Sequence, residues 1–389
     1  MNVDRTEDRQ PRYHAIDNLR AMMISIVMLG HAILPYVTIP RSFKDPETHV
    51  GFDVVAVFLY SFAMPVFFVT AGFATALIHR RKGTRTLARQ RFQFVFLPLL
   101  AAYLVISPLT RGAYEFAKHA AISGSLQPGL DILLRGEWIR LGKAYHLWFL
   151  VSLLFYTAMA ICLRWGVLRF AGGRAASILA ASRRLLASRW RATSLSLVIA
   201  LAMVPAYVIH GKDATTLPMQ LALFGFFLLG WLLYLHRDLL PTFTHQPWRP
   251  IAVAIATLPL AAWSTRERLM SPYDSQALIG ILAGVSNSIL AAFMTFGLLG
   301  IYLARFSHSS ALGRYVSDAS YWIYLIHLPL LIAVSGVLTV TPLPAVIKYL
   351  LTIAVVVPIV LASYHFGVRS TRLGSLLKSG KRSTASRDP

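Results

Sequence analysis

The feature that most constrains this chain is a series of apolar blocks, each about 20 residues long and almost free of charge. The run LALFGFFLLGWLLYL is typical of them. A helix of that length can cross the hydrocarbon core of a bilayer. Because a bilayer offers no water to unpaired backbone groups, such blocks must form α-helices. They also lack the polar–apolar alternation that the strands of a membrane β-barrel require.

Composition supports the same class of protein. Of 389 residues, 56% are hydrophobic and only 14% are charged, whereas an ordinary soluble domain is about 25% charged. We therefore predict an all-α, polytopic membrane protein of about ten transmembrane helices. Residues 1–366 form the transmembrane domain, and residues 367–389 form a basic cytoplasmic tail that we expect to be disordered. The expected spans lie at about 19–38, 52–79, 92–110, 146–166, 193–209, 217–236, 249–264, 278–304, 319–340 and 344–365.

The basic residues indicate how the chain is oriented. Of the 38 lysines and arginines, 27 fall at the two termini or in loops on the same side as the termini. Because cytoplasmic loops carry the excess of Lys and Arg, we predict that both termini are cytoplasmic. Topogenic charge on the cytoplasmic loops then accounts for the net charge of +22, and no nucleic-acid partner is expected. The single cysteine, Cys162, excludes an intramolecular disulfide and a cysteine-based metal site, and we predict no metal.

The first span, AIDNLRAMMISIVMLGHAILPYV, carries three ionisable residues on one face. Arg20 and His31 are 11 residues apart, which is within about 20° of three full helical turns. Asp17 precedes Arg20 by three residues and can pair with it. His31 lies about 16 Å deeper than Arg20, near the membrane centre, where an ionisable side chain normally faces an interior cavity. We interpret His31 as a general base; the alternative is a histidine that only joins helices.

Other spans also carry polar residues at depth. In DASYWIYLIHLPLLI, Tyr324 and His327 share a face with Asp318, and they either bind substrate or join helices. His146 begins the block HLWFL near the outer interface, where it is expected to line the mouth of a cavity. In the second span, the small residues around Gly72 predict a close approach of another helix.

Arginines gather at the cytoplasmic end of the third span. Arg89 and Arg91 lie on the same side of the membrane as Arg20. Most cytoplasmic arginines need only topology or anionic lipid to explain them. A guanidinium group, however, matches phosphate geometry, so this group is also suited to the phosphates of a nucleotide-like donor. No glycine-rich phosphate loop accompanies it.

Four blocks of the sequence stand out, in this order: DNLRAMMISIVMLGH at 17–31, MPVFFVTAGF at 64–73, HLWFL at 146–150 and DASYWIYLIHLP at 318–329. Together they resemble the acyltransferase-3 family of integral membrane acyltransferases. The resemblance covers nearly the whole chain and is strongest to members that modify periplasmic glucans. It implies about ten helices around a central pore open to both sides, an acyl-CoA donor from the cytoplasm and a carbohydrate acceptor on the periplasmic side.

The resemblance also implies that His31 is catalytic and that Arg20 is the characteristic first-span arginine. The family's third-span Arg-x-x-Arg motif is not kept, because Phe94 stands where the second arginine would come. Arg89 is the candidate substitute. In the mechanism that we expect, the following residues act: Asp17, Arg20 and His31 in catalysis, Arg20, Arg89 and Arg91 in donor binding, and His146, Tyr324 and His327 in acceptor binding.

The sequence leaves several alternatives open. The acyl group is succinyl by analogy with the glucan-modifying relatives, or acetyl by analogy with the wider family. Direct transfer and an acyl-histidine intermediate both fit His31. A transporter or flippase of a glycan precursor, or a scaffold whose polar groups only join helices, would use the same side chains. For each of these roles we expect a multi-pass protein of the bacterial inner membrane.

Overall fold

The computed structural model describes residues 13–210, 215–271, 277–308, 311–371 and 374. Within these residues the chain forms twelve α-helices and no β-strand. The N-terminal arginines before residue 13 and most of the predicted disordered tail lie outside the described residues. The helices are α1 (His14–Ile33), α2 (Val50–Arg91), α3 (Leu97–Ser123), α4 (Gln127–Arg135), α5 (Trp148–Phe170), α6 (Arg174–Ala187), α7 (Arg191–His210), α8 (Leu217–Leu235), α9 (Trp248–Met270), α10 (Ala277–Arg305), α11 (Ala311–Leu338) and α12 (Ala345–Ala362).

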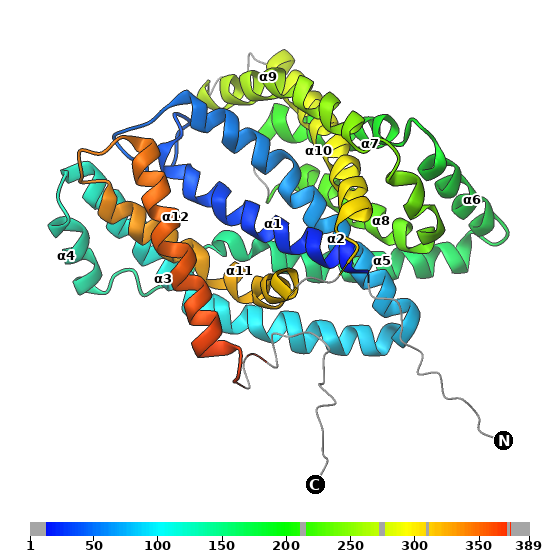
Figure 1. The fold of residues 1–389 in the computed structure, drawn as a ribbon, viewed down its shortest axis with the longest axis horizontal. Coiled ribbons are helices and arrows are strands. Elements are labelled where there is room, and N and C mark those ends of the chain that lie inside the picture. Colours follow the sequence, from blue (N-terminus) through cyan, green and yellow to red (C-terminus); the bar gives the residue numbers. More distant parts are fainter. Residues whose placement is uncertain (1–12, 211–214, 272–276, 309–310, 372–373, 375–389) are drawn as a thin grey trace, which may run out of the picture.

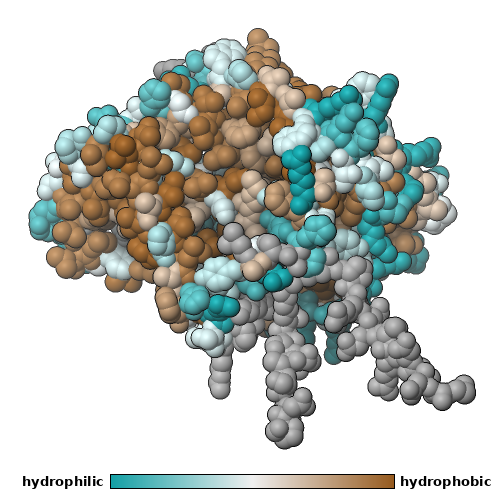
Figure 2. Space-filling model, viewed as in Figure 1, coloured by the Kyte–Doolittle hydropathy of each residue, from teal (hydrophilic) through white to brown (hydrophobic). Residues whose placement is uncertain are grey.

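Each of the ten expected spans coincides with one of these helices, and the prediction of an all-α polytopic membrane protein is confirmed. Eight stretches of the described residues are long and apolar enough to cross a membrane. One of them, Val50–Ser123, covers two expected spans, whereas α9 is too polar to be included. Figure 2 shows hydrophobic residues across much of one face of the molecule and hydrophilic residues gathered toward the side where α6 lies.

The segment 80–91 corrects the expected boundary between the second and third spans. It is helical and belongs to α2, although we expected a loop. The charged residues that suggested a loop are also good helix formers. The helix is kinked at Gly83. The φ of this residue is 76°, a value that glycine adopts readily because it has no Cβ atom. A π-helical turn, Phe92–Phe96, then leads into α3.

Helices α2 and α8 touch through their backbones. A Cβ atom added to Gly72 would lie 1.9 Å from the carbonyl oxygen of Phe227, and one added to Gly230 would lie 1.9 Å from that of Val69. Only glycine permits such an approach, and small residues are the usual means of close packing in membranes. The close contact expected at Gly72 is therefore confirmed.

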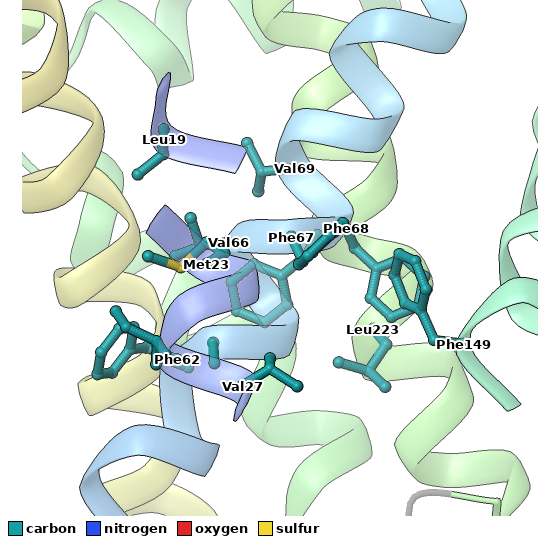
Figure 3. Close-up of a cluster of buried hydrophobic side chains, with 14 of the residues drawn as sticks. Leu19, Met23, Val27, Phe62, Val66, Phe67, Phe68, Val69, Phe149 and Leu223 are labelled. Carbon is teal, nitrogen blue, oxygen red and sulfur yellow. The ribbon is translucent and has the colours of Figure 1, made fainter. Parts of the chain in front are cut away.

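The hydrophobic core surrounds α1, which crosses the middle of the bundle (Figure 1). Met23 and Val27, one helical turn apart, belong to the same buried cluster as Val66 of α2 (Figure 3). On the other side of α2, the rings of Phe68 and Phe149 have centroids 4.9 Å apart. This packing holds α1 in place between its two polar ends, which are Arg20 near its start and His31 in its last turn.

Helices α4 and α6 lie at opposite ends of the molecule (Figure 1). Helix α4 follows α3, which continues to Ser123, and Gly136 caps the end of α4. The α1–α2 loop (residues 34–49) follows the C-terminal end of α1. Asp45 in this loop forms a buried ion pair of 2.9 Å with Lys348 of α12, so the loop is tied to the bundle beside His31.

Candidate functional site

Three histidines from distant parts of the chain meet at one point of the bundle. His31 comes from α1, His327 from α11, and His146 from the 3-10 turn Tyr145–Leu147. Nδ1 of His31 lies 3.2 Å from Nε2 of His327, and the His146 and His327 ring centroids are 5.1 Å apart. No group of three or more possible metal ligands was found in the described parts of the chain.

The hydrogen bonds determine which nitrogen of His327 carries the proton. Its Nδ1 faces the carbonyl oxygens of Ile323 at 3.0 Å and Tyr324 at 2.8 Å. A carbonyl oxygen only accepts hydrogen bonds, so Nδ1 of His327 must be an N–H. In the neutral ring, Nε2 of His327 then accepts a hydrogen bond from Nδ1–H of His31. This arrangement leaves Nε2 of His31 with a free lone pair, as a general base requires.

His146 is held by a gap in the backbone hydrogen bonds of α11. Pro329 has no N–H, so the carbonyl of Leu325, four residues earlier, loses its helical donor. Nε2 of His146 lies 3.1 Å from that carbonyl oxygen and donates to it. Nδ1 of His146 is therefore a bare acceptor, and it is buried without a hydrogen-bond partner in the described structure.

The backbone around His146 is also unusual. Tyr145 has a φ of 45°, a left-handed conformation that costs a non-glycine residue on the order of 1 kcal/mol. Its ring stacks on Tyr114 with centroids 5.6 Å apart. The hydroxyl of Tyr324 donates to the His146 carbonyl at 2.6 Å. These contacts support the strained turn and aim the imidazole inward.

A cavity of about 500 Å³ lies beside the histidines. Its wall is mostly apolar, with a few polar groups, which is the usual character of a small-molecule site. One such group is the Ser61 hydroxyl, which donates to the Asn287 side chain at 2.5 Å; Asn287 in turn donates to Thr265 at 2.8 Å. The polar residues that line the cavity are His31, Arg41, Tyr60, Ser61, His146, Tyr207, Thr265, Asn287 and Tyr324.

Several of these residues, among them Arg41 and Tyr60, were not singled out by the sequence. Arg41 lies in the α1–α2 loop and also lines a second, smaller cavity of about 100 Å³ that His31 shares. Tyr60 of α2 contacts His31 edge to face, with ring centroids 5.8 Å apart. The one available signal was that Arg41 belongs to the minority of basic residues predicted on the outer side.

The predicted donor-binding arginines lie at the other end of α1. Arg20 pairs with Asp17 at 3.4 Å, as its helical spacing predicted, and donates to Ser317 of α11 at 3.2 Å. Arg91 donates to the Thr75 hydroxyl, and its Nε is buried without a partner in the described structure. Arg20 and Arg91 are close enough for their charges to repel each other. The Arg89 side chain is instead exposed.

The two polar regions are separated by the hydrophobic core. The residues that line the large cavity include His31 but neither Arg20 nor Arg91. Between the two regions, Met23 of α1 and Val66 of α2 are fully buried in apolar packing (Figure 3). The pore expected to open to both sides is therefore not continuous through this cavity.

Comparison with known proteins yields one family. A family model described as an acyltransferase domain matches residues 13–365. Similar curated proteins are the glucans biosynthesis protein C of Salmonella paratyphi B, of Salmonella schwarzengrund and of Salmonella enteritidis PT4. Each is 24% identical to this chain, and each alignment covers 95% of both proteins. No solved structure matches the chain.

Proposed function

The chain belongs to this acyltransferase family, and from that premise we propose that it is a membrane O-acyltransferase. It takes an acyl group, succinyl or acetyl, from acyl-CoA on the cytoplasmic side and transfers it to a carbohydrate hydroxyl on the periplasmic side. The similarity to glucans biosynthesis protein C supports a periplasmic glucan, or another surface glycan, as the acceptor. The protein resides in the bacterial inner membrane with both termini in the cytoplasm.

The observation that carries this proposal is the His31–His327 pair at the wall of the large cavity. Nε2 of His31 takes the proton of the acceptor hydroxyl while the oxygen attacks the thioester carbonyl. The new C–O bond forms, the carbonyl electron pair moves to oxygen, and it returns as the C–S bond breaks. The departing thiolate takes the proton from His31, which regenerates the neutral imidazole and yields the ester and free CoA.

The donor end of the site rests on Arg20 and Arg91. Arg91 has a buried and unpartnered Nε and lies close to a second cation, Arg20, so an anion beside Arg91 would stabilise this region. The phosphates of CoA supply that anion and match guanidinium geometry. Asp17 orients Arg20 through its ion pair. Arg89, being exposed, is assigned to the first encounter with the phosphates.

The acceptor end of the site consists of His146, His327 and the residues around them. The bare Nδ1 of His146 accepts a hydrogen bond from a sugar hydroxyl. Tyr324 holds His146 in place through its carbonyl, and His327 orients His31. The Ser61–Asn287 pair adds polar contacts at the wall of the same cavity.

The test is acyl transfer by the purified protein in lipid nanodiscs, with acetyl-CoA and succinyl-CoA as donors and a gluco-oligosaccharide as acceptor. Thiol release and the mass of the product are both measured. His31→Ala should abolish transfer while the amount of folded protein is unchanged. His245→Ala, which removes an exposed histidine outside the cavity, is the matched control and should retain full activity. Equal transfer by His31→Ala and the wild type would refute the mechanism.

The same experiment separates the remaining alternatives. A transporter or flippase would move a glycan without consuming acyl-CoA, and no ester-sized mass increment would appear. An acyl-histidine intermediate would be detected as an acyl mass on the peptide that contains His31, after a brief reaction with donor alone. Its absence would favour direct transfer.

A further inference from the structure

The buried hydroxyl of Tyr60 has no hydrogen-bond partner in the described structure. Native proteins seldom leave a buried polar group unpaired, because its desolvation costs free energy that no bond returns. Tyr60 also lines the large cavity beside His31. A donor that is buried, unpaired and next to the proposed base is suited to a ligand atom that is present only during the reaction.

Arg41 approaches the same point from the α1–α2 loop. It lines both cavities, and its charge acts on His31 and on Tyr60. Within the described residues Arg41 forms no ion pair. Asp45 of the same loop pairs with Lys348, and Asp53 of α2 pairs with Arg266. The guanidinium group is therefore available to an anion in the cavity.

The position of Arg41 is fixed by the fold of its loop. Thr38, three residues earlier, donates its backbone N–H to Asp53 at 2.7 Å, and Asp53 pairs with Arg266 of α9 at 3.2 Å. The buried Asp45–Lys348 pair holds the loop four residues later. Since the loop is anchored on both sides of Arg41, this cation is held at the wall of the site although its side chain is exposed.

Resting on the function proposed above, we propose that the Tyr60 hydroxyl and the Arg41 guanidinium stabilise the oxyanion that forms when the acceptor attacks the thioester carbonyl. As the C–O bond forms, negative charge develops on the former carbonyl oxygen. Tyr60 donates its O–H to that oxygen, and Arg41 adds an N–H donor and a positive charge. Neither residue gains or loses a proton overall, because His31 carries the transferred proton from the hydroxyl to the thiolate.

A pair of donors in this position acts on the transition state more than on the bound substrate. Removal of one donor from an oxyanion site typically lowers kcat by roughly 10²–10³-fold. Tyr60→Phe should therefore lower kcat by about 10²-fold, with KM changed by less than about threefold. Arg41→Gln should lower kcat by at least about tenfold, and Arg41→Lys should recover part of that loss because it keeps the charge.

The experiment is steady-state kinetics with acetyl-CoA or succinyl-CoA and a gluco-oligosaccharide, using the protein in nanodiscs. Tyr103→Phe is the matched control for the hydroxyl, since the Tyr103 hydroxyl donates to the Gly142 carbonyl at 2.9 Å and does not line the cavity. Arg140→Gln is the control for the loss of an exposed charge. Both controls should stay within about twofold of the wild-type kcat.

The double variant Tyr60→Phe/Arg41→Gln gives an independent readout. If both groups serve one oxyanion, the double variant should lose less than the product of the two single losses. Arg41 is exposed, so its variants test the proposal even if Tyr60→Phe does not fold. Wild-type kcat in Arg41→Gln, or a rise in KM alone in either single variant, would overturn the assignment.

The failure of this inference is distinguishable from the failure of the proposed function. Activity in the wild type, loss in His31→Ala, and full kcat in Tyr60→Phe and Arg41→Gln would leave the function standing and remove only the oxyanion role. A wild-type protein that releases no thiol from either donor would remove both.

Discussion

At the scale of single residues, the imidazole of His31 depends on His327. A base is useful only if the correct nitrogen is unprotonated, and neutral histidine can protonate either one. The carbonyls of Ile323 and Tyr324 hold the proton on Nδ1 of His327, and His327 then holds the proton of His31 on Nδ1. Two backbone carbonyls of α11 thereby direct the lone pair of His31 toward the cavity.

His327→Phe should remove this control while keeping a ring of similar size. We expect kcat to fall by roughly 10²-fold, the lower end of the usual contribution of a general base, with little change in KM. His327→Gln retains an amide oxygen that can accept from Nδ1–H of His31, so it should recover part of the rate. Equal rates in the Phe and Gln variants would contradict a positioning role for His327.

At the scale of elements, a proline in α11 does two things. Pro329 weakens the helix by removing one backbone hydrogen bond, and the released Leu325 carbonyl becomes the partner of His146. A helical N–H at position 329 would compete with His146 for this carbonyl oxygen. The site therefore uses a local defect of α11 to hold a side chain that comes from a different part of the chain.

Pro329→Ala supplies the missing N–H and should draw the Leu325 carbonyl back into the helix. His146 would lose its anchor, and we expect about a tenfold loss of transfer without a loss of folded protein. The readouts are the rate of thiol release and the thermal unfolding temperature. Pro358→Ala in α12, where the proline lines neither cavity, should leave the rate unchanged. A parallel fall in the control would show that the proline acts only on folding.

At the scale of the whole molecule, the two polar regions lie toward opposite ends of α1, with the hydrophobic core between them. The histidine cavity is near the α1–α2 loop, whereas Arg20 and Arg91 lie near the start of α1 and the end of α2. This polarity suits a reaction whose donor and acceptor arrive from different sides. In the proposed mechanism, a donor arm that enters beside Arg20 would have to displace apolar side chains of the core, such as Met23, on its way to His31.

The predicted orientation can be tested with single cysteines. In a Cys162→Ser background, Ser125→Cys is placed between α3 and α4, and Ala180→Cys is placed on α6; both positions are exposed. A membrane-impermeant maleimide should label Ser125→Cys in spheroplasts and should label Ala180→Cys only after the membrane is opened. The reverse pattern would place both termini outside the cytoplasm and would reverse the direction of donor entry.

Much of the architecture could be predicted from the sequence because it depends on local patterns. Apolar length predicted the ten helical spans, and helical spacing predicted the Asp17–Arg20 pair. Local patterns were less informative where the same residue types are common in two kinds of secondary structure. The basic segment 80–91 fits both a loop and a helix, since Lys and Arg are good helix formers, and only the structure shows that it is helical.

The sequence by itself thus determined the class of protein, its helices and the individual histidines. Tertiary structure decided that these histidines meet, because His31 and His327 are 296 positions apart and His146 and Leu325 are 179 apart. The periodic pattern of apolar and polar residues in a sequence does not predict contacts between residues so far apart. The tertiary structure also identified Arg41 and Tyr60 as candidate site residues. Both line the cavity, and the Tyr60 hydroxyl is buried without a hydrogen-bond partner in the described structure. These properties arise only when several helices pack together, since packing decides which polar groups water can still reach.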